Sequence, residues 1–309
     1  MSLNVKKYWE TSTPPPPQNQ IIGKYHVKGE IHRPTNYSYI YLSSNVNNKA
    51  EKVLKFVKCK RNETNKILNE VEIMKILKHP NILELDDYFL FKEYMCIVTQ
   101  FLPLSSLHDL IIDHYNQGIP EDMASKIMYQ LLDALNYLHK NNICHRDIKT
   151  ENILMVDSDP KHPIVKLSDF GSAGYLAKDS KSNEFIGTYN FSAPEILQHI
   201  KYTKKVDIWS LGITLYVMLT GMLPFPSYSY SPIDCKYMII NGCLNYELLY
   251  DFGISNDAID LIMKMCKVDP NLRITAEEAM KHPWIVSQRS NKNEAYTSES
   301  QIVEYYISK

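Results

Sequence analysis

The chain has 309 residues, of which 44% are hydrophobic and 22% charged, and its formal net charge is −1. That length suits two packed lobes, and a nearly neutral charge argues against a strong polyanionic partner such as nucleic acid. The six cysteines form no C-x-x-C pair, and neither a signal-peptide core nor about 18 consecutive apolar residues occurs, so we expect a reduced cytoplasmic or nuclear protein that spans no membrane.

Residues 1–20 form a leader that contains the proline run Pro14–Pro17. Prolines cannot donate backbone hydrogen bonds and favour an extended polyproline conformation, so we predict a flexible leader outside the fold. The alternative is that residues 14–17 bind a proline-recognition domain.

The next hundred residues predict a sheet with one helix. Polar and apolar residues alternate over residues 25–59, which indicates antiparallel strands. Apolar side chains recur at helical spacing over residues 62–77 and stop before Pro80, where a helix must end. Two further strands are predicted over 81–87 and 95–101.

The remainder of the chain is mainly helical in pattern. Long amphipathic or buried helices are predicted over residues 124–140, 205–219 and 256–267. Residues 286–309 are polar and without pattern for most of their length, which predicts a disordered tail. The alternative is that the apolar residues near its end pack back on the domain as a regulatory element.

The richest motif is the run from His145 to Asn152, which reads H-R-D-I-K-T-E-N, followed by D-F-G from Asp169. Phosphoryl transfer needs a carboxylate that orients a hydroxyl, a cation that balances charge, and oxygen ligands for a metal ion. We assign Asp147 as the catalytic base and Lys149 as the cation. Asn152 and Asp169 are the predicted ligands of Mg²⁺ or Mn²⁺. Either triplet alone is common in turns, but the two in this order are improbable by chance.

These motifs, with Ala193-Pro194-Glu195 further along, resemble those of eukaryotic protein kinases over about residues 25–285. Lys149 and the pair Gly187-Thr188 are similar to the serine/threonine branch, and the H-P-W-I sequence from His282 is similar to calmodulin-dependent kinases.

The resemblance implies a bilobal α+β fold in which the kinase domain covers residues 21–285. Its strand-rich N-lobe, with one regulatory helix, is expected over about residues 21–102 and its helical C-lobe over about 103–285. The implied activity is transfer of the γ-phosphoryl group of ATP to serine or threonine hydroxyls of proteins.

The resemblance also implies contacts with ATP. Lys55 occupies the place of the lysine that holds the α and β phosphates and pairs with a carboxylate on the helix. Spacing to the His-Pro turn selects Glu70 as that carboxylate, and leaves Glu72 as a solvated charge. Further contacts with the nucleotide are expected from Ile40, Val53, Thr99, Gln100, Leu102 and Leu154, with Thr99 as the gatekeeper.

The phosphate-covering loop departs from the family pattern, because residues 33–38 contain no glycine where the family has G-x-G-x-x-G. We expect the hydroxyls of Thr35 and Ser38, or Arg33, to replace backbone contacts with the phosphates. The departure keeps a second hypothesis open, a pseudokinase that binds ATP weakly and acts as a scaffold or allosteric module. Retention of Lys55 and of the catalytic motif favours activity.

Regulatory and structural roles are also implied by the resemblance. Arg146 and Glu184 are expected to form a charge pair that replaces activation-segment phosphorylation and gives basal activity. The other regulatory positions are Ser182 and Thr188. The expected structural residues are His145 and Phe170 in an apolar spine, Asp207 as acceptor of backbone hydrogen bonds that anchor it, and Glu195 with Arg273 as a buried ion pair.

Overall fold

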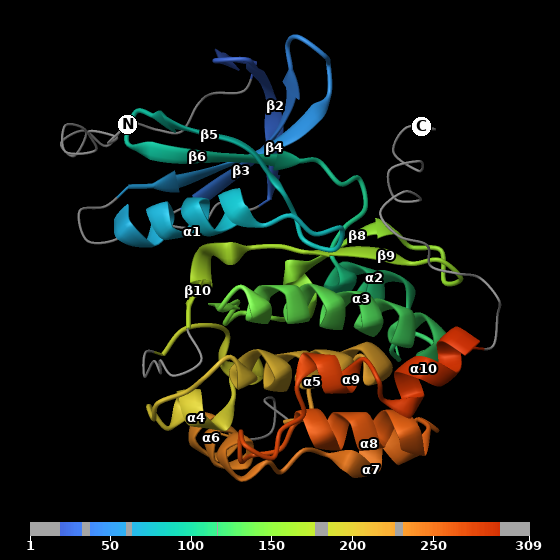
Figure 1. Cartoon of the computed structure of the whole chain (residues 1–309). Coiled ribbons are helices and arrows are strands. Elements are labelled where there is room, and N and C mark those ends of the chain that lie inside the picture. Colours follow the sequence, from blue (N-terminus) through green and yellow to red (C-terminus); the bar gives the residue numbers. More distant parts are fainter. Residues whose placement is uncertain are drawn as a thin grey trace. The chain divides into compact units, whose positions relative to one another are not determined.

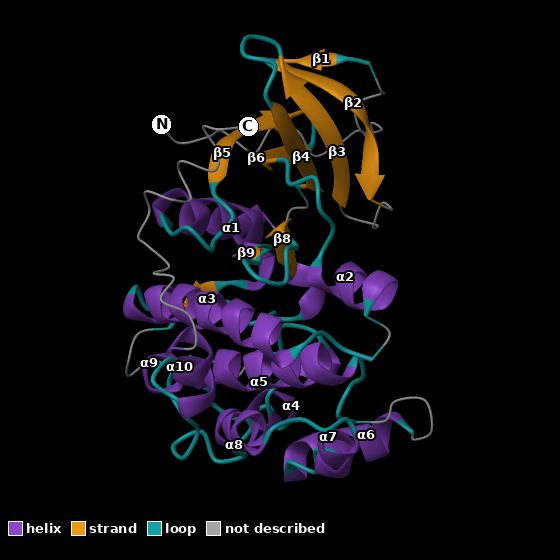
Figure 2. Cartoon of the chain, turned by 90° about the vertical axis from the view of Figure 1, so that its right-hand side faces the viewer, coloured by secondary structure: helices purple, strands orange, loops and turns teal. Residues whose placement is uncertain are grey.

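The chain folds into two compact units. One comprises Met1–Lys78 with Leu83–Pro103, and the other His79–Ile82 with Leu104–Lys309. The structure is a computed structural model that describes residues 19–32, 38–59, 64–115, 117–176, 185–225 and 231–290. The first unit is built on a sheet and the second is mainly helical, as Figure 2 shows by colour, which is the predicted α+β class.

The described part of the first unit contains one six-stranded sheet with antiparallel neighbours. In spatial order its strands are β1 (Ile21–Ile22), β2 (Tyr25–His32), β3 (Ser38–Asn45), β4 (Glu51–Lys58), β6 (Tyr94–Gln100) and β5 (Leu85–Phe91). The alternation read from the sequence explains β4, because Leu54 and Phe56 are fully buried on one side while Lys55 points to the other.

Aromatic rings fill one side of this sheet. The Phe56 ring meets Tyr41 edge-on, with ring centroids 5.9 Å apart. Tyr25 of β2 stacks on Phe89 of β5 at 6.0 Å, and its hydroxyl donates to Asp87 Oδ2 at 3.0 Å. Because β2 and β5 lie near opposite ends of the strand order, these contacts require the sheet to curl around its aromatic core.

Helix α1 (Thr64–Ile76) lies along the other side of the sheet (Figure 1), within the predicted range 62–77. Its buried residues are Ile67, Glu70, Val71, Ile73 and Met74. A buried carboxylate such as Glu70 is costly unless a cation pairs with it, so the packing of α1 already predicts a charged partner on the sheet.

The second unit is mainly helical. Its described helices are α2 (Leu107–His114), α3 (Glu121–Lys140), α4 (Pro194–Leu197), α5 (Lys205–Thr220), α6 (Pro232–Asn241), α7 (Tyr246–Asp251), α8 (Asn256–Met265), α9 (Ala276–Ala279) and α10 (Pro283–Ser290). Capping boxes begin α2, α6 and α9, where Ser106, Ser231 and Thr275 pair with a carboxylate three residues on. The strand pairs are β7 (Ile143–Cys144) with β10 (Gly174–Tyr175), and β8 (Ile153–Asp157) with β9 (Ile164–Leu167).

Helix α5 forms the centre of this unit, and every residue from Val206 to Thr220 is buried. It packs against α3 and α8. Gly212 makes the close approach to the end of α8 feasible, because a Cβ there would lie 2.7 Å from Cys266 Sγ and 2.9 Å from Met265 Cβ. Across the described residues, no helix combines the length and the apolarity that a bilayer crossing requires.

The strand predicted over residues 81–87 is offset, since β5 spans Leu85–Phe91. The segment His79–Ile82 instead packs within the second unit. The buried Asn81 amide donates to Val165 O at 2.9 Å and to Gln130 Oε1 at 2.7 Å, and Ile82 bridges to Leu167. Residues with these partners cannot also belong to the first sheet.

The prediction of a patternless polar tail from residue 286 is wrong for its first residues, because α10 continues to Ser290. Pro283 opens the helix, where its missing N–H costs no hydrogen bond, and Trp284 and Ile285, each 1% exposed, anchor it. Residues 1–18 and 291–309 lie outside the described residues, so the expectations for the proline leader and the far tail stay predictions.

Candidate active site

The loop after β7, which carries the predicted catalytic residues, is held by a buried carboxylate of α5. Asp207 Oδ2 accepts the N–H of His145 at 2.9 Å, and its Oδ1 accepts the N–H of Arg146 at 2.8 Å. Burial alone raises the pKa of Asp207, but hydrogen bonding to His139 Nε2 at 2.9 Å and to the backbone leaves that pKa below its usual range. The charged carboxylate therefore fixes the loop, as predicted for Asp207, and holds Arg146 at a left-handed φ of 68°.

His145 connects this loop to the Asp169 segment. Its ring is fully buried, Nε2 donates to Ser168 O at 3.0 Å, and Nδ1 accepts the N–H of Asp147 at 3.3 Å. The ring also meets Phe170 edge-on with centroids 4.9 Å apart. His145 and Phe170 are thus in contact, as expected of a shared apolar spine.

The Asp147 carboxylate lies among a hydroxyl, a lysine and an amide. Thr188 Oγ1 donates to Asp147 Oδ1 at 2.7 Å and accepts a hydrogen bond from Lys149 Nζ, also at 2.7 Å. Lys149 Nζ is 3.4 Å from Asp147 Oδ2, and Asn152 Nδ2 donates to the same oxygen at 3.2 Å. A carboxylate that accepts a hydrogen bond from a hydroxyl group, with an ammonium group beside it, can orient an alcohol for attack.

Asn152 and Asp169 are held next to each other through Ser168. The N–H and the Oγ of Ser168 both donate to Asn152 O at 2.9 Å. Asn152 Nδ2 also donates to Asp147 O at 2.8 Å, so the amide nitrogen is committed and the amide oxygen is the atom suited to a hard cation. Asp169 has a left-handed φ of 59°, a strained conformation for a non-glycine residue.

These two oxygen donors fit Mg²⁺, which takes one or two protein ligands and completes its shell with phosphates and water. No cluster of three or more His, Cys, Asp or Glu side chains suited to a metal ion occurs in the part of the chain that the structure describes. The donor set therefore fits a metal that arrives with a polyphosphate better than a resident structural metal.

The first unit contains the predicted pair of Lys55 and Glu70. Lys55 Nζ on β4 lies 2.8 Å from Glu70 Oε1 on α1, and Glu70 is only 4% exposed. Glu72, the rejected alternative, is exposed and pairs with Lys75 one helical turn away. The partly exposed Lys55 ammonium and the buried Glu70 carboxylate satisfy each other's charge.

The predicted nucleotide contacts of this unit share one face of the sheet. Ile40 pairs with Lys55 across β3 and β4, and Val53 pairs with Thr99 across β4 and β6. Residues opposite each other or two apart on a strand point the same way, so these four side chains lie on the α1 side of the sheet. Thr99 is 8% exposed there.

The other predicted nucleotide contacts are spread over the chain. Ser38 begins β3 opposite Val57, on the same face, Gln100 ends β6, and Leu102 follows it. Leu154 lies on β8 of the second unit opposite Lys166. Thr35 lies outside the described residues, as do Glu184 and Ser182, so the expected pairing of Glu184 with Arg146 stays a prediction.

Arg146 contacts the segment that follows Asp169. Its Nε donates to Ser172 O at 2.7 Å. A Cβ on Gly174 would lie 2.3 Å from Arg146 Nη2, so a larger residue there would require the guanidinium to move. Strand β10 in turn pairs with β7, which joins the segment after Asp169 to the start of the catalytic loop.

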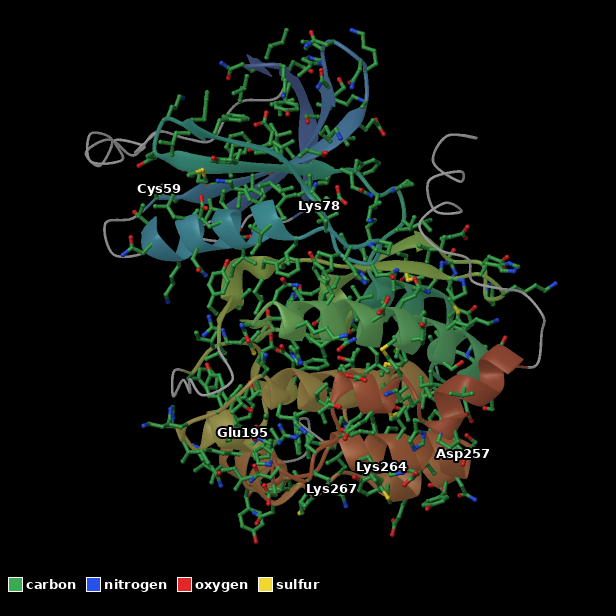
Figure 3. The ribbon with its side chains drawn as sticks, in the orientation of Figure 1. Cys59, Lys78, Glu195, Asp257, Lys264 and Lys267 are labelled. Atoms are coloured by element: carbon green, nitrogen blue, oxygen red, sulfur yellow. The ribbon has the colours of Figure 1, made fainter. Side chains whose placement is uncertain are left out.

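The buried ion pair predicted in the second unit is confirmed. Arg273 Nη1 and Nη2 donate to the two carboxylate oxygens of Glu195 at 2.7 and 3.0 Å, with both residues at most 2% exposed. Figure 3 shows Glu195 on α4. The Arg273 guanidinium also lies over the Trp209 ring at 5.4 Å. A two-point contact of this kind fixes geometry and serves structure instead of chemistry.

Sequence reasoning missed the place of Thr188 and the need for Gly187. Thr188 was expected as a regulatory residue, yet its hydroxyl contacts both Asp147 and Lys149. Gly187 has a φ of 107°, and a Cβ there would lie 2.3 Å from Arg146 O. The signal available in the sequence was the glycine before Thr188, because glycine is favoured where the backbone has a positive φ or passes close to another part of the chain.

Residues 35–285 match the family described as protein kinase domain. The chain therefore belongs to the protein kinase family. A structure described as Rad53 1–466 in complex with AMP-PNP is similar with a TM-score of 0.73 and 30% identity, over 85% of this chain and 65% of that one. The strand-rich first unit and helical second unit correspond to the N-lobe and C-lobe of the kinase fold.

The curated relatives are also named as protein kinases. A probable myosin light chain kinase of Dictyostelium discoideum is 34% identical over 72% of this chain and 56% of its own length. The calcium/calmodulin-dependent protein kinase cmkA of Emericella nidulans is 36% identical over 73% and 53%. The serine/threonine-protein kinase cds1 of Schizosaccharomyces pombe is 36% identical over 75% and 50%. This chain spans about half the length of the curated relatives it matches.

Proposed function

We propose that the chain is an active serine/threonine protein kinase that transfers the γ-phosphoryl group of ATP to hydroxyls of protein substrates. The observation that carries the proposal is the Thr188 hydroxyl, which donates to Asp147 Oδ1 and accepts from Lys149 Nζ, both at 2.7 Å. A carboxylate and ammonium that already hold one alcohol in this way are suited to a substrate alcohol. The kinase names of relatives at about 35% identity support the same reaction.

In this reaction Asp147 orients the acceptor hydroxyl and takes its proton as the oxygen attacks the γ-phosphorus, while the bond from that phosphorus to the β–γ bridging oxygen breaks and ADP leaves. Lys149 offsets negative charge on the transferred phosphoryl group. His145 and Asp207 keep Asp147 in place, because they bond its own N–H and the two preceding ones. The activity thus depends on positioning by the loop more than on any one strong base.

Each unit by itself carries residues with a proposed role at the nucleotide end of the reaction. Asn152 and Asp169 would hold Mg²⁺ or Mn²⁺, which when bound would neutralise charge on the phosphates. Lys55, held by Glu70, would bind the α and β phosphates, with Ile40, Val53 and Thr99 towards the base. These roles follow from the residue types and from the family, and each is testable by substitution.

One feature favours the second candidate, a pseudokinase that serves as a binding module. The stretch 33–38 lacks glycine, and Gly29 cannot substitute for one because it lies within β2, paired with Leu42. Without glycine the backbone approaches phosphates less closely, which lowers the affinity for ATP. The Lys55–Glu70 pair and the ordered catalytic loop argue that affinity is reduced and not abolished.

The test uses the full chain, with Asp147→Asn as the control. Thermal shift with magnesium and ATP reports binding, and radiolabelled ATP with a mixture of serine and threonine peptides reports transfer. We expect a shift for both proteins and labelled product for the parent alone. A thermal shift without labelled product in the parent would support the binding module instead. The absence of both a shift and a product would end the enzymatic interpretation.

A further inference from the structure

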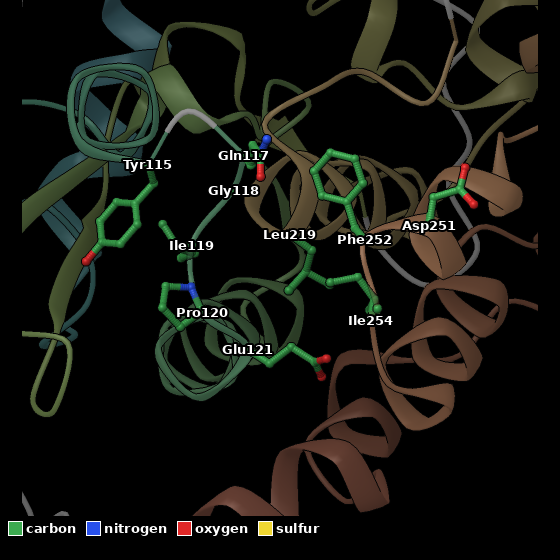
Figure 4. Close-up of a pocket in the computed structure, with 11 residues that line it drawn as sticks. Tyr115, Gln117, Gly118, Ile119, Pro120, Glu121, Leu219, Asp251, Phe252 and Ile254 are labelled. Carbon is green, nitrogen blue, oxygen red and sulfur yellow. The ribbon is translucent and has the colours of Figure 1, made fainter.

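A pocket of about 730 Å3 lies on the second unit, away from the catalytic loop in the sequence. The connection between α2 and α3 supplies Tyr115 and Ile119 on one side, and the segment after α7 supplies Phe252 and Ile254 on the other (Figure 4). Leu219, at the end of α5, also lines it. The volume falls within the range of about 300–1,000 Å3 typical of ligand pockets.

The α2–α3 side of the pocket is fixed by backbone contacts. Ile119 N donates to Met218 O at 2.7 Å, and Gly118, at a φ of 89°, passes so close to α5 that a Cβ would lie 2.4 Å from Leu219 O. On the other side, Ile254 N donates to Leu249 O at 3.0 Å. A pocket whose walls are tied in this way is largely formed before anything binds.

Of the two carboxylates in the lining, Asp251 and Glu121, the second is already satisfied. Glu121 accepts hydrogen bonds from Ser255 N at 2.7 Å, Ser255 Oγ at 2.6 Å and Trp284 Nε1 at 2.8 Å. These three donors join the start of α3 to α8 and α10, and leave Glu121 little capacity for a cation. The lining also contains the exposed polar residues Gln117 and Asp251, but Leu219, Phe252 and Ile254 give it an apolar part that suits apolar side chains, since Phe252 and Ile254 are only half buried.

The chain itself contains such side chains in the sequence that follows α10. Trp284 at the start of α10 contacts the pocket rim through Glu121, and the described chain ends one helix later, at Ser290. The sequence that follows is polar until it reaches Ile302-Val303 and Tyr305-Tyr306-Ile307. We propose that the segment 302–307 of this same chain docks in the pocket.

The geometry of the connection permits this docking. The start of α10 lies next to Glu121, where Trp284 donates to it. The helix has eight residues, so Ser290 at its end lies about 12 Å from that start. Residues 291–301 span up to about 36 Å when extended, which exceeds the return distance. A segment tethered this closely has an effective concentration on the order of millimolar, so even weak apolar contacts keep the pocket occupied.

The test places a photoreactive p-benzoylphenylalanine at position 305 in the full chain, with the same replacement at Tyr296 as a matched control. After irradiation, mass spectrometry maps the crosslinks. We expect crosslinks within one molecule from position 305 to residues 115–121 or 251–254, at about fivefold higher yield than from position 296.

Pocket variants complete the test. Ile254→Asp should lower the crosslinks from position 305 about fivefold, whereas Tyr250→Asp, at a 57% exposed residue outside the pocket, should leave them unchanged. If Ile254→Asp fails to fold by thermal shift, Phe252→Ala replaces it. Crosslinks that map elsewhere, that join two molecules, or that survive the pocket variants would each overturn docking within the chain.

Discussion

Asp207 Oδ1 accepts the backbone N–H of Arg146 at 2.8 Å, and it does so while Arg146 holds a left-handed φ of 68°. The carboxylate thus stabilises a conformation that costs a non-glycine residue about 1–2 kcal/mol. Because Asp147 is the next residue, the strain and its compensation set the direction of the proposed catalytic base.

Asp207→Asn keeps the shape of the side chain but replaces one acceptor oxygen with an N–H donor. We expect the free energy of unfolding to fall by about 2–3 kcal/mol, because a buried backbone N–H loses its acceptor, and we expect kcat to fall with it. Urea unfolding and a peptide kinase assay measure the two. Asp113→Asn, at an exposed residue of α2, should change neither; equal effects of the two variants would contradict the anchoring role.

The same residue predicts a pH dependence. The pKa of Asp207 is lowered in the folded protein from an ordinary value of 3.8, so its contribution to stability is present above 3.8 and is lost as the pH falls through the lower folded-state pKa. The difference in unfolding free energy between the parent and Asp207→Asn should therefore shrink in acid. Urea titrations from neutral pH downward test this, and a difference that is constant with pH would refute it.

Glu70 and Glu72 provide a matched pair on α1. Glu70→Gln leaves Lys55 without its buried carboxylate and should cost about 1–3 kcal/mol of stability and weaken ATP binding. Glu72→Gln removes only an exposed pair with Lys75 and should stay within about 0.5 kcal/mol. Thermal shift with and without magnesium and ATP compares them. Similar nucleotide affinities for the two variants would count against the assigned role of Lys55.

Gly187→Ala tests the close contact before Thr188. Its Cβ would lie 2.3 Å from Arg146 O, so the backbone must move and carry Thr188 with it. We expect kcat/KM to fall on the order of 100-fold, because misplacement by about 1 Å near the reacting groups has that effect. Gly23→Ala, at a φ of 57° with nothing within 4 Å, introduces backbone strain alone and should leave kcat/KM unchanged. Loss of activity in both variants would point to a general folding defect.

Glu184→Ala tests the prediction that a carboxylate replaces activation-segment phosphorylation. If Glu184 pairs with Arg146, phosphatase-treated protein should lose several-fold activity on this substitution, about the value of one charge-assisted hydrogen bond. A peptide kinase assay on both phosphatase-treated proteins measures the loss. Equal activities would show that basal activity, if present, has another source.

The sequence predicted the parts of the site whose signals are local or spaced by a known helix or strand. Lys55 was assigned to an apolar strand and Glu70 to a helix of known register, and the two are 2.8 Å apart. The long helices α3, α5 and α8 begin or end within a few residues of their predicted bounds, because several turns of apolar periodicity define them.

The rest depends on contacts between segments far apart in the chain. Thr188 reaches Asp147 across 41 residues, and Asn81 reaches Val165 across 84. No periodicity records such pairs, so Thr188 received a different role and Asn81 was placed in a strand. The four-residue helices α4 and α9 were also missed, because one turn is too short to show a 3.6-residue pattern.

The assignment of His79–Ile82 to the C-lobe means that the two lobes cannot be separated by one cut in the chain. A fragment that starts at Leu104 would contain every described helix from α2 onward, yet it would lack Asn81. The Val165 carbonyl and the Gln130 side chain would then lose a hydrogen-bond donor next to β9. An isolated C-lobe intended for expression therefore needs this four-residue piece restored, for instance by a permuted chain that carries it.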